Sequence, residues 1–138
     1  MRIFKYLLLA LALCSVALLQ VAKAETFGIE TLQLQYFEQE WGQAQPNQSV
    51  DRHPLAIDGK RFEHGLGTHA NSVFRLALGG KGERFTASVG VDDEVGKQGS
   101  IEFQVTGDGK TLWESGVLHG GDPAKEVSVA LDGVKRCV

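Results

Sequence analysis

The chain has 138 residues, which predicts one domain, and it carries 14 basic and 17 acidic side chains for a formal charge of −3. A mildly acidic chain is not expected to bind nucleic acid or an anionic membrane surface, because both attract basic proteins.

Residues 1–24 have the pattern of a secretory signal peptide. Two basic residues precede an apolar run from Tyr6 to Val21, and Ala22-Lys23-Ala24 then places small residues at the −3 and −1 positions of a cleavage site. The run is shorter than the roughly 20 residues that span a bilayer, so cleavage is favoured over an uncleaved anchor. We expect a secreted or periplasmic domain of residues 25–138 that has no contact with the membrane after cleavage.

Removal of the signal peptide leaves 11 basic against 17 acidic side chains, a formal charge of −6. It also leaves Cys137 as the last cysteine, so no disulfide can form within the mature chain although export would permit one. Either Cys137 pairs outside this chain, or the chain normally continues past Val138.

The first part of the mature chain has few regular patterns. Thr31 to Tyr36 alternates between polar and apolar residues, which predicts a strand. Residues 37–48 have no periodicity and predict a long loop. Pro54 to Ile57 predicts a short strand that ends in a turn at Asp58-Gly59.

The later part alternates with period 2, as strands with one buried face do. Glycine- and aspartate-rich turns separate these segments, and no segment keeps apolar residues at helical spacing for three turns. The chain is therefore predicted to be all-β, an antiparallel sandwich or barrel. The alternating segments are Phe74–Leu78, Phe85–Val91, Ile101–Val105 and Val127–Leu131.

Two features between these strands could have structural or binding roles. His69 lies in a glycine-rich corner, residues 65–72, where it could be a buried imidazole bonded at both nitrogens or a donor to a ligand hydroxyl. Asp92-Asp93-Glu94 ends a strand, and its charge could be compensated by turn amides, by Arg75 or Arg84, by sugar hydroxyls, or by a structural calcium ion, for which the local ligands are few. A solvated strand end is the plain alternative, and no metal site or cofactor is predicted.

A sugar site needs an aromatic ring for the C–H face of the pyranose and polar groups for its hydroxyls. Trp41 lies in the predicted long loop and is the leading aromatic candidate, although a core position is as reasonable for it. Trp113 lies on a predicted strand and is expected in the core. The polar candidates, if the loops converge at one edge of the sandwich, are His69, Asn71, Arg75 and Asp92.

The order and spacing of several motifs resemble the NPCBM domain, a family of carbohydrate-binding modules. The resemblance covers about Leu32 to Val138. It is carried by LAIDG at 55–59, GLGTHANS at 65–72, RFTASVGVDD at 84–93, SIEFQV at 100–105 with DGK at 108–110, and ESGV at 114–117.

The resemblance implies a galactose-binding-like jelly-roll sandwich that is secreted and binds a carbohydrate ligand, often beside a glycoside hydrolase domain acting on galactose-containing glycans. In the family the strand that begins near residue 133 continues through an apolar run, whereas this chain stops at Val138. From that comparison we expect residues 25–138 to be a domain whose last strand is incomplete, and our hypothesis is that the chain is a fragment, or a truncated reading frame, of a longer protein.

Two other functions remain open from the residues. A glycoside hydrolase needs two carboxylates facing each other across a cleft, whereas Asp92 and Asp93 would point to opposite faces of a strand. The motifs of a nucleophile elbow, a zinc protease and a phosphate loop are absent. A structural or interaction sandwich without sugar affinity is the third possibility, since fold does not fix function.

Overall fold

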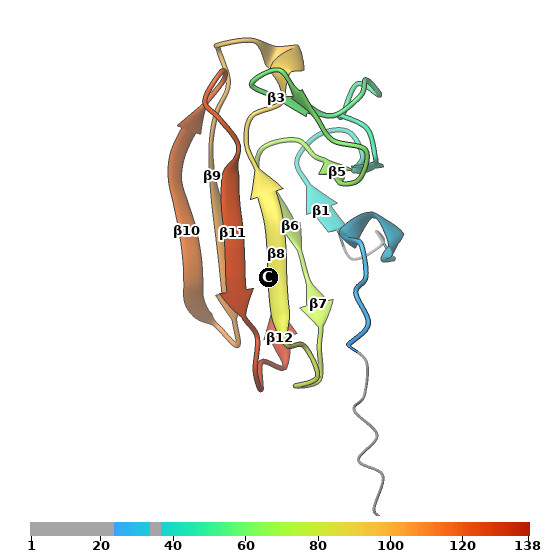
Figure 1. Cartoon of the computed structure of the whole chain (residues 1–138), viewed down its shortest axis with the longest axis vertical. Helices are drawn as coiled ribbons and strands as arrows, with labels where there is room; N and C mark the ends of the chain where they lie inside the picture. Colours follow the sequence, from blue (N-terminus) through green and yellow to red (C-terminus); the bar gives the residue numbers. More distant parts are fainter. Residues whose placement is uncertain (1–23, 34–36) are drawn as a thin grey trace, which may run out of the picture.

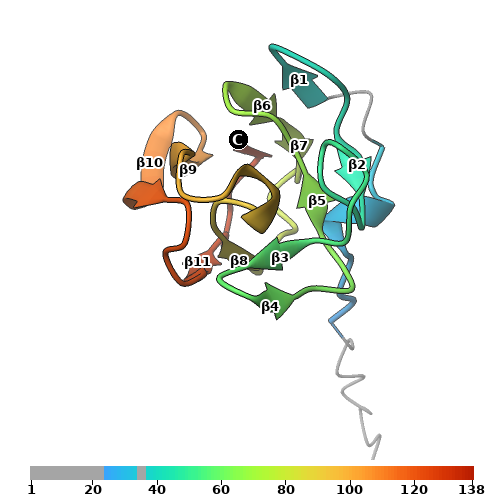
Figure 2. The same cartoon turned by 90° about the horizontal axis from the view of Figure 1, so that it is seen from above.

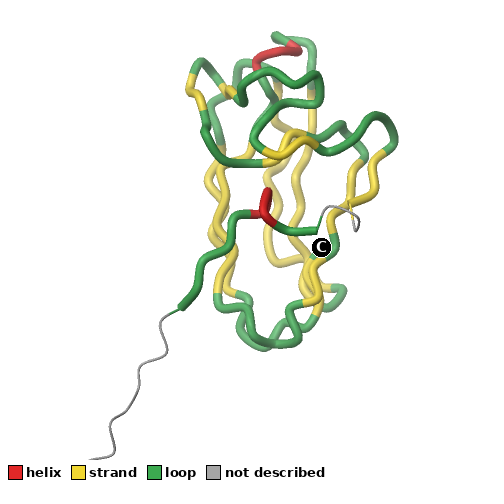
Figure 3. Tube along the Cα trace, turned by 90° about the vertical axis from the view of Figure 1, so that its right-hand side faces the viewer, coloured by secondary structure: helices red, strands yellow, loops and turns green. Residues whose placement is uncertain are grey.

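Antiparallel strands form two facing layers in the computed structural model, which describes residues 24–33 and 37–138 (Figure 1). One layer contains the sheet β10–β9–β12–β7, and the other contains the pair β11–β8, as the view from above shows (Figure 2). The helical parts of the described residues are short 3-10 turns (Figure 3). The predicted all-β sandwich is therefore confirmed.

The strands of the two layers are mostly those that the period-2 pattern predicts. The longest pair is β9–β10, whose hairpin turns at Asp108 and Gly109, both with positive φ, as a two-residue hairpin requires. The two layers contain β7 (Leu76–Ala77), β8 (Arg84–Val89), β9 (Ser100–Gly107), β10 (Lys110–His119), β11 (Lys125–Ala130) and β12 (Arg136–Cys137).

Shorter elements lie at the top of the sandwich and along the right-hand side of its upper half in Figure 1. They are joined in the pairs β1–β6, β2–β5 and β3–β4. Their bounds are η1 (Ile29–Thr31), β1 (Phe37–Gln39), β2 (Gln45–Pro46), β3 (Ala56–Ile57), β4 (Lys60–Arg61), β5 (Leu66–Gly67), β6 (Ser72–Phe74) and η3 (Asp93–Val95).

The core lies between the layers. Val127 on β11 is 2% exposed, and Trp113 packs partly buried against this cluster, which confirms its predicted core position. Burial of such side chains stabilises the fold by about 1.5–3 kcal/mol each. The buried cluster consists of Val105, Val127, Val129, Leu131 and Cys137.

Two predictions for the first part of the chain were wrong. Thr31 belongs to the 3-10 turn η1 and not to a strand, while Leu34 to Tyr36 lie outside the described residues. Residues 37–48 contain the strands β1 and β2 and are not one long loop. These strands are three and two residues long, so an alternation of polar and apolar residues is too short to be recognised in them. The predicted signal peptide, apart from Ala24, also lies outside the described residues.

Candidate functional site

Trp41 and His69 form an aromatic corner on the surface. Their ring centroids are 5.6 Å apart, and the ring planes meet at 59°. Trp41 is 59% exposed, which is unusual for so large an apolar side chain. Together with Glu40 the two rings line a shallow concavity that is widely open to solvent.

The pairing of β1 with β6 brings these residues together. Gln39 is opposite Ser72 in the antiparallel register, and the amide of Glu40 donates to the carbonyl of Asn71 at 3.2 Å. Trp41 leaves β1 at the same edge where the chain arrives from His69. Two segments that are about 30 residues apart in the sequence therefore present their side chains side by side.

Glu40 is a site residue that sequence analysis missed. Its Oε2 accepts a hydrogen bond from Nδ2 of Asn71 at 2.7 Å. Asn71 has a φ of +55°, a conformation that asparagine tolerates better than most residues. The bond fixes the Glu40 carboxylate beside the aromatic corner. Only the β1–β6 register reveals this role, and that register was hidden by the assignment of 37–48 to a loop.

His69 is not fully buried, and among the described residues only one of its ring nitrogens has a hydrogen-bond partner. It is half-buried, and its Nδ1 lies 2.9 Å from the carbonyl of Ala70, which makes Nδ1 the donor and leaves Nε2 as an acceptor. The corner around it depends on Gly67, where an added Cβ would lie 2.1 Å from the backbone oxygen of Gln48. The glycine thus permits β5 to approach the backbone of Gln48 and Ser49, which follow β2.

Arg75 lies apart from the aromatic corner. Its Nη1 forms an exposed ion pair with Oε1 of Glu38 at 2.8 Å. Asn71 and Arg75 flank opposite ends of β6. The partner Glu38 belongs to β1, so the ion pair of Arg75 and Glu38 extends the polar surface along the β1–β6 pair.

Asp92 lies in a network that holds loop backbone. Its Oδ2 accepts from the amide of Ala56 at 3.2 Å, and its Oδ1 accepts from the amide of Glu94 at 3.0 Å, capping η3. Asp93 accepts from the amides of Asp58 and Gly59 at 2.9 and 2.8 Å. The expectation that Asp92 and Asp93 point to opposite faces was therefore wrong. The chain turns into η3 at these residues, and both carboxylates face the β3–β4 hairpin.

Glu94 completes this acidic segment. Its Oε2 accepts from the hydroxyl of Ser49 and lies 3.1 Å from Nδ1 of His53. The three acids are thus compensated by backbone amides, a hydroxyl and an imidazole. Arg84 and Arg75 take no part, since Arg84 donates to the hydroxyl of Ser128. Among residues 24–33 and 37–138, no three metal-ligating side chains are grouped to hold an ion.

The aromatic corner is suited to a polyhydroxylated ring. An exposed indole can cover C–H groups, while a carboxylate, an amide and an imidazole offer acceptors and donors to hydroxyls.

In the described part of the chain, no helix is both long and apolar enough to cross a membrane.

The model of the NPCBM/NEW2 domain family matches residues 25–137. The chain is 37% identical over 101 residues to a protein of Renibacterium salmoninarum named as an endo-alpha-N-acetylgalactosaminidase, covering 69% of this chain and 7% of that protein. It is 37% identical over 102 residues to alpha-1,3-galactosidase B of Akkermansia muciniphila, covering 71% of this chain and 13% of that protein. It therefore spans a small part of these relatives.

A solved structure gives the same fold. The CBM51 module of a Clostridium perfringens GH95 protein, in complex with methyl-galactose, superposes with a TM-score of 0.73 at 26% identity. The match covers 80% of this chain and 82% of that module.

Proposed function

The chain belongs to the NPCBM/NEW2 domain family, and on that premise we propose that it binds galactose-containing glycans at the aromatic corner. The observation that carries the proposal is the pairing of an exposed Trp41 with His69 beside the fixed carboxylate of Glu40. The family and the galactoside-bound CBM51 neighbour support carbohydrate as the ligand class.

The chemistry of galactose fits this surface. Its axial 4-hydroxyl leaves one face of the ring with a continuous patch of C–H groups, which an indole can cover. Nε2 of His69 and the free Oε1 of Glu40 would accept hydrogen bonds from hydroxyls, while Asn71 holds Glu40 in place. Each charge-assisted bond contributes about 1.5–3 kcal/mol when it is shielded from water.

We propose binding without catalysis. Among the residues lining the concavity, Glu40 supplies the one carboxylate, whereas most glycosidases use a pair across the scissile bond. Because the relatives from Renibacterium and Akkermansia carry names of glycosidases, we further propose that the domain is secreted and directs an attached or associated glycoside hydrolase to its substrate.

Retention on galactose-agarose and calorimetric titration with methyl galactoside test the proposal. Trp41→Ala should weaken binding at least about tenfold, equivalent to about 1.4 kcal/mol, because the stacking surface is lost. Val117→Ala, which removes another exposed apolar side chain on β10, is the matched control and should bind normally. Unchanged binding in Trp41→Ala would overturn the proposed site. No binding by the wild-type protein would overturn the proposed function.

Arg75 and Asp92 stay predictions that the same assay tests. Arg75→Ala should weaken a ligand that extends along the β1–β6 pair more than it weakens a monosaccharide. Asp92→Ala should act through the loop backbone, so its effect on binding should come with a lower melting temperature.

A further inference from the structure

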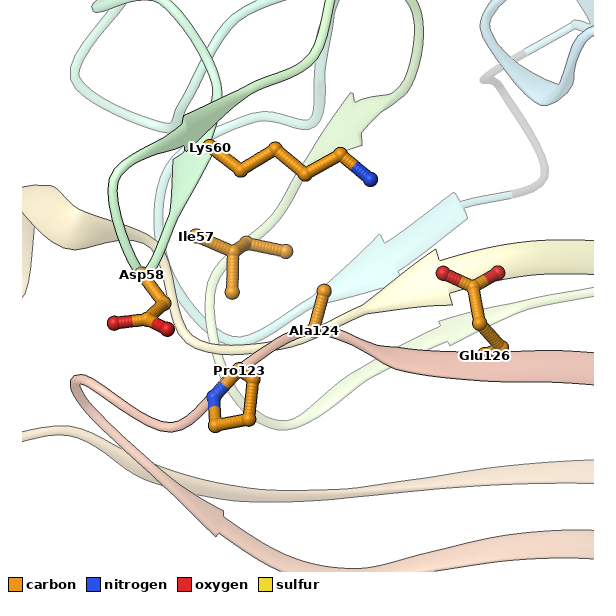
Figure 4. Close-up of a pocket in the computed structure, with 6 residues that line it drawn as sticks. All are labelled: Ile57, Asp58, Lys60, Pro123, Ala124 and Glu126. Carbon is orange, nitrogen blue, oxygen red and sulfur yellow. The ribbon is translucent and has the colours of Figure 1, made fainter.

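A second groove lies between the β3–β4 hairpin and the start of β11. Its volume is about 180 Å³, and it has an apolar floor with charged groups at its margins. Asp58 and Glu126 lie at opposite ends, and the side chain of Lys60 extends along one side (Figure 4). Between them lie the apolar side chains Ile57, Pro123 and Ala124.

Both walls of the groove are fixed. Asp93 holds the hairpin turn through the amides of Asp58 and Gly59. Ile57 rests on Gly90, where an added Cβ would come within 2.7 Å of it. On the opposite wall, Glu126 is paired with Ser88 in the β8–β11 register. The groove is therefore formed before any ligand arrives, which lowers the cost of binding.

The charged groups keep unused hydrogen-bonding capacity. Ser88 donates to Oε1 of Glu126 at 2.7 Å, which orients the carboxylate and leaves Oε2 available. Lys60 contacts the ring of Phe62, with Nζ 5.0 Å from the centroid, and has no ion pair within the described residues. The groove therefore offers one cationic donor and one oriented acceptor on either side of an apolar floor.

An acetamido group has the complementary pattern. Its methyl group is apolar, its N–H donates and its C=O accepts, so it can satisfy the floor, Glu126 and Lys60 together. An acidic sugar would meet two carboxylates and one ammonium, and a plain hydroxyl would leave the apolar floor without a partner.

We propose that this groove is a second carbohydrate subsite, which takes the acetamido group of an N-acetylhexosamine. The Glu126 carboxylate accepts from the amide N–H, the Lys60 ammonium donates to the carbonyl, and the methyl group rests on Ile57, Pro123 and Ala124. The inference rests on the proposed carbohydrate-binding function, but it uses residues separate from the aromatic corner.

An NMR titration of the mature domain separates the two sites. Methyl N-acetylgalactosaminide is added to the Trp41→Ala variant, in which the aromatic corner is impaired, and methyl galactoside serves as the ligand without an acetamido group. The N-acetylated sugar should shift the amide signals of Gly59, Lys60 and Ala124. Methyl galactoside should leave these signals unchanged, while in the wild-type protein it shifts those of Glu40 and Asn71.

Two variants test the assigned contacts. Lys60→Met removes the ammonium but keeps an unbranched side chain of similar length, and Glu126→Gln keeps the size of the side chain, so each should weaken groove binding at least about fivefold with little change in the melting temperature. Lys81→Met and Glu102→Gln, at exposed positions outside the groove, are the matched controls. Equal groove shifts with both sugars, no groove shift, or no effect of either variant would overturn the subsite. If methyl galactoside does not shift the amide signals of Glu40 and Asn71 in the wild-type protein, that result would instead contradict the proposed function.

Discussion

Ser49 donates its hydroxyl to the carboxylate of Glu94, which lies 45 residues further along the chain. The same hydroxyl accepts from the backbone amide of His53 at 3.0 Å, so it joins a loop to the turn η3. Ser49 is 1% exposed, and removal of its oxygen would leave two polar groups without this partner. The loop end of the sandwich is thus held by hydrogen bonds between segments that are distant in sequence.

Ser49→Ala should lower the free energy of unfolding by about 1 kcal/mol, because the part-buried carboxylate of Glu94 and the amide of His53 both lose the hydroxyl that they share. Urea denaturation followed by tryptophan fluorescence measures this change. Ser128→Ala, which removes a hydroxyl from an exposed strand position, should stay within about 0.5 kcal/mol of the wild type. Equal stability of the two variants would show that the Ser49 bridge is dispensable.

Asp93→Ala should loosen the β3–β4 hairpin, since both of its carboxylate oxygens accept backbone amides there. We expect a loss of about 1 kcal/mol of global stability, discounted because the side chain is exposed. Hydrogen exchange at the amides of Asp58 and Gly59 should become faster. Asp51→Ala, another exposed acid, is the control, and unchanged exchange in Asp93→Ala would contradict the assignment.

Asp108 makes the fold sensitive to acid. Amides of Lys135 and Arg136, at 3.0 and 2.9 Å, hold the pKa of the Asp108 carboxyl below its ordinary value. Because the folded state favours the carboxylate, this contribution is present above the unfolded pKa, about 3.9, and is lost as the pH falls through the lower folded pKa.

Asp108→Asn tests this dependence at a position of positive φ that asparagine also tolerates. The variant should be less stable than the wild type at pH 7, and the difference should shrink below about pH 4 as Asp108 becomes protonated. Urea midpoints measured across this range provide the check. A difference that stays constant with pH would contradict the role of the charge.

Cys137 should react slowly with thiol reagents in the native protein. It is 5% exposed, and burial raises the pKa of its thiol, which lowers the thiolate population that reacts. Labelling with a chromogenic disulfide at pH 8 should be at least about tenfold faster in denaturant. Equal rates would show that the end of β12 opens readily.

The sandwich was predictable where strands are long enough to alternate. Phe85 to Val89 and Val127 to Ala130 each place every second residue on the core side, and the pair β8–β11 has that register. The hairpin turn at Asp108-Gly109 between β9 and β10 was equally predictable, because both residues have positive φ and few residue pairs tolerate that conformation.

The candidate site was only partly predictable. Trp41 and His69 were identified by residue type, but their contact depends on β1, which is three residues long and has no pattern of its own. Glu40 was missed for the same reason. Asp92 was recognised as unusual, yet its partner is a backbone amide, and no side chain in the sequence reveals such a bond.

The separation between core and site has a consequence for variation of the domain. The buried cluster belongs to β9, β11, β12 and the turn after β11, whereas the aromatic corner lies on the segments flanking β1 and β6. Substitutions at Glu40, Trp41 or His69 therefore remove little buried apolar area. If sugar binds at this corner as proposed, directed evolution should change the sugar preference of the domain with little loss of thermal tolerance.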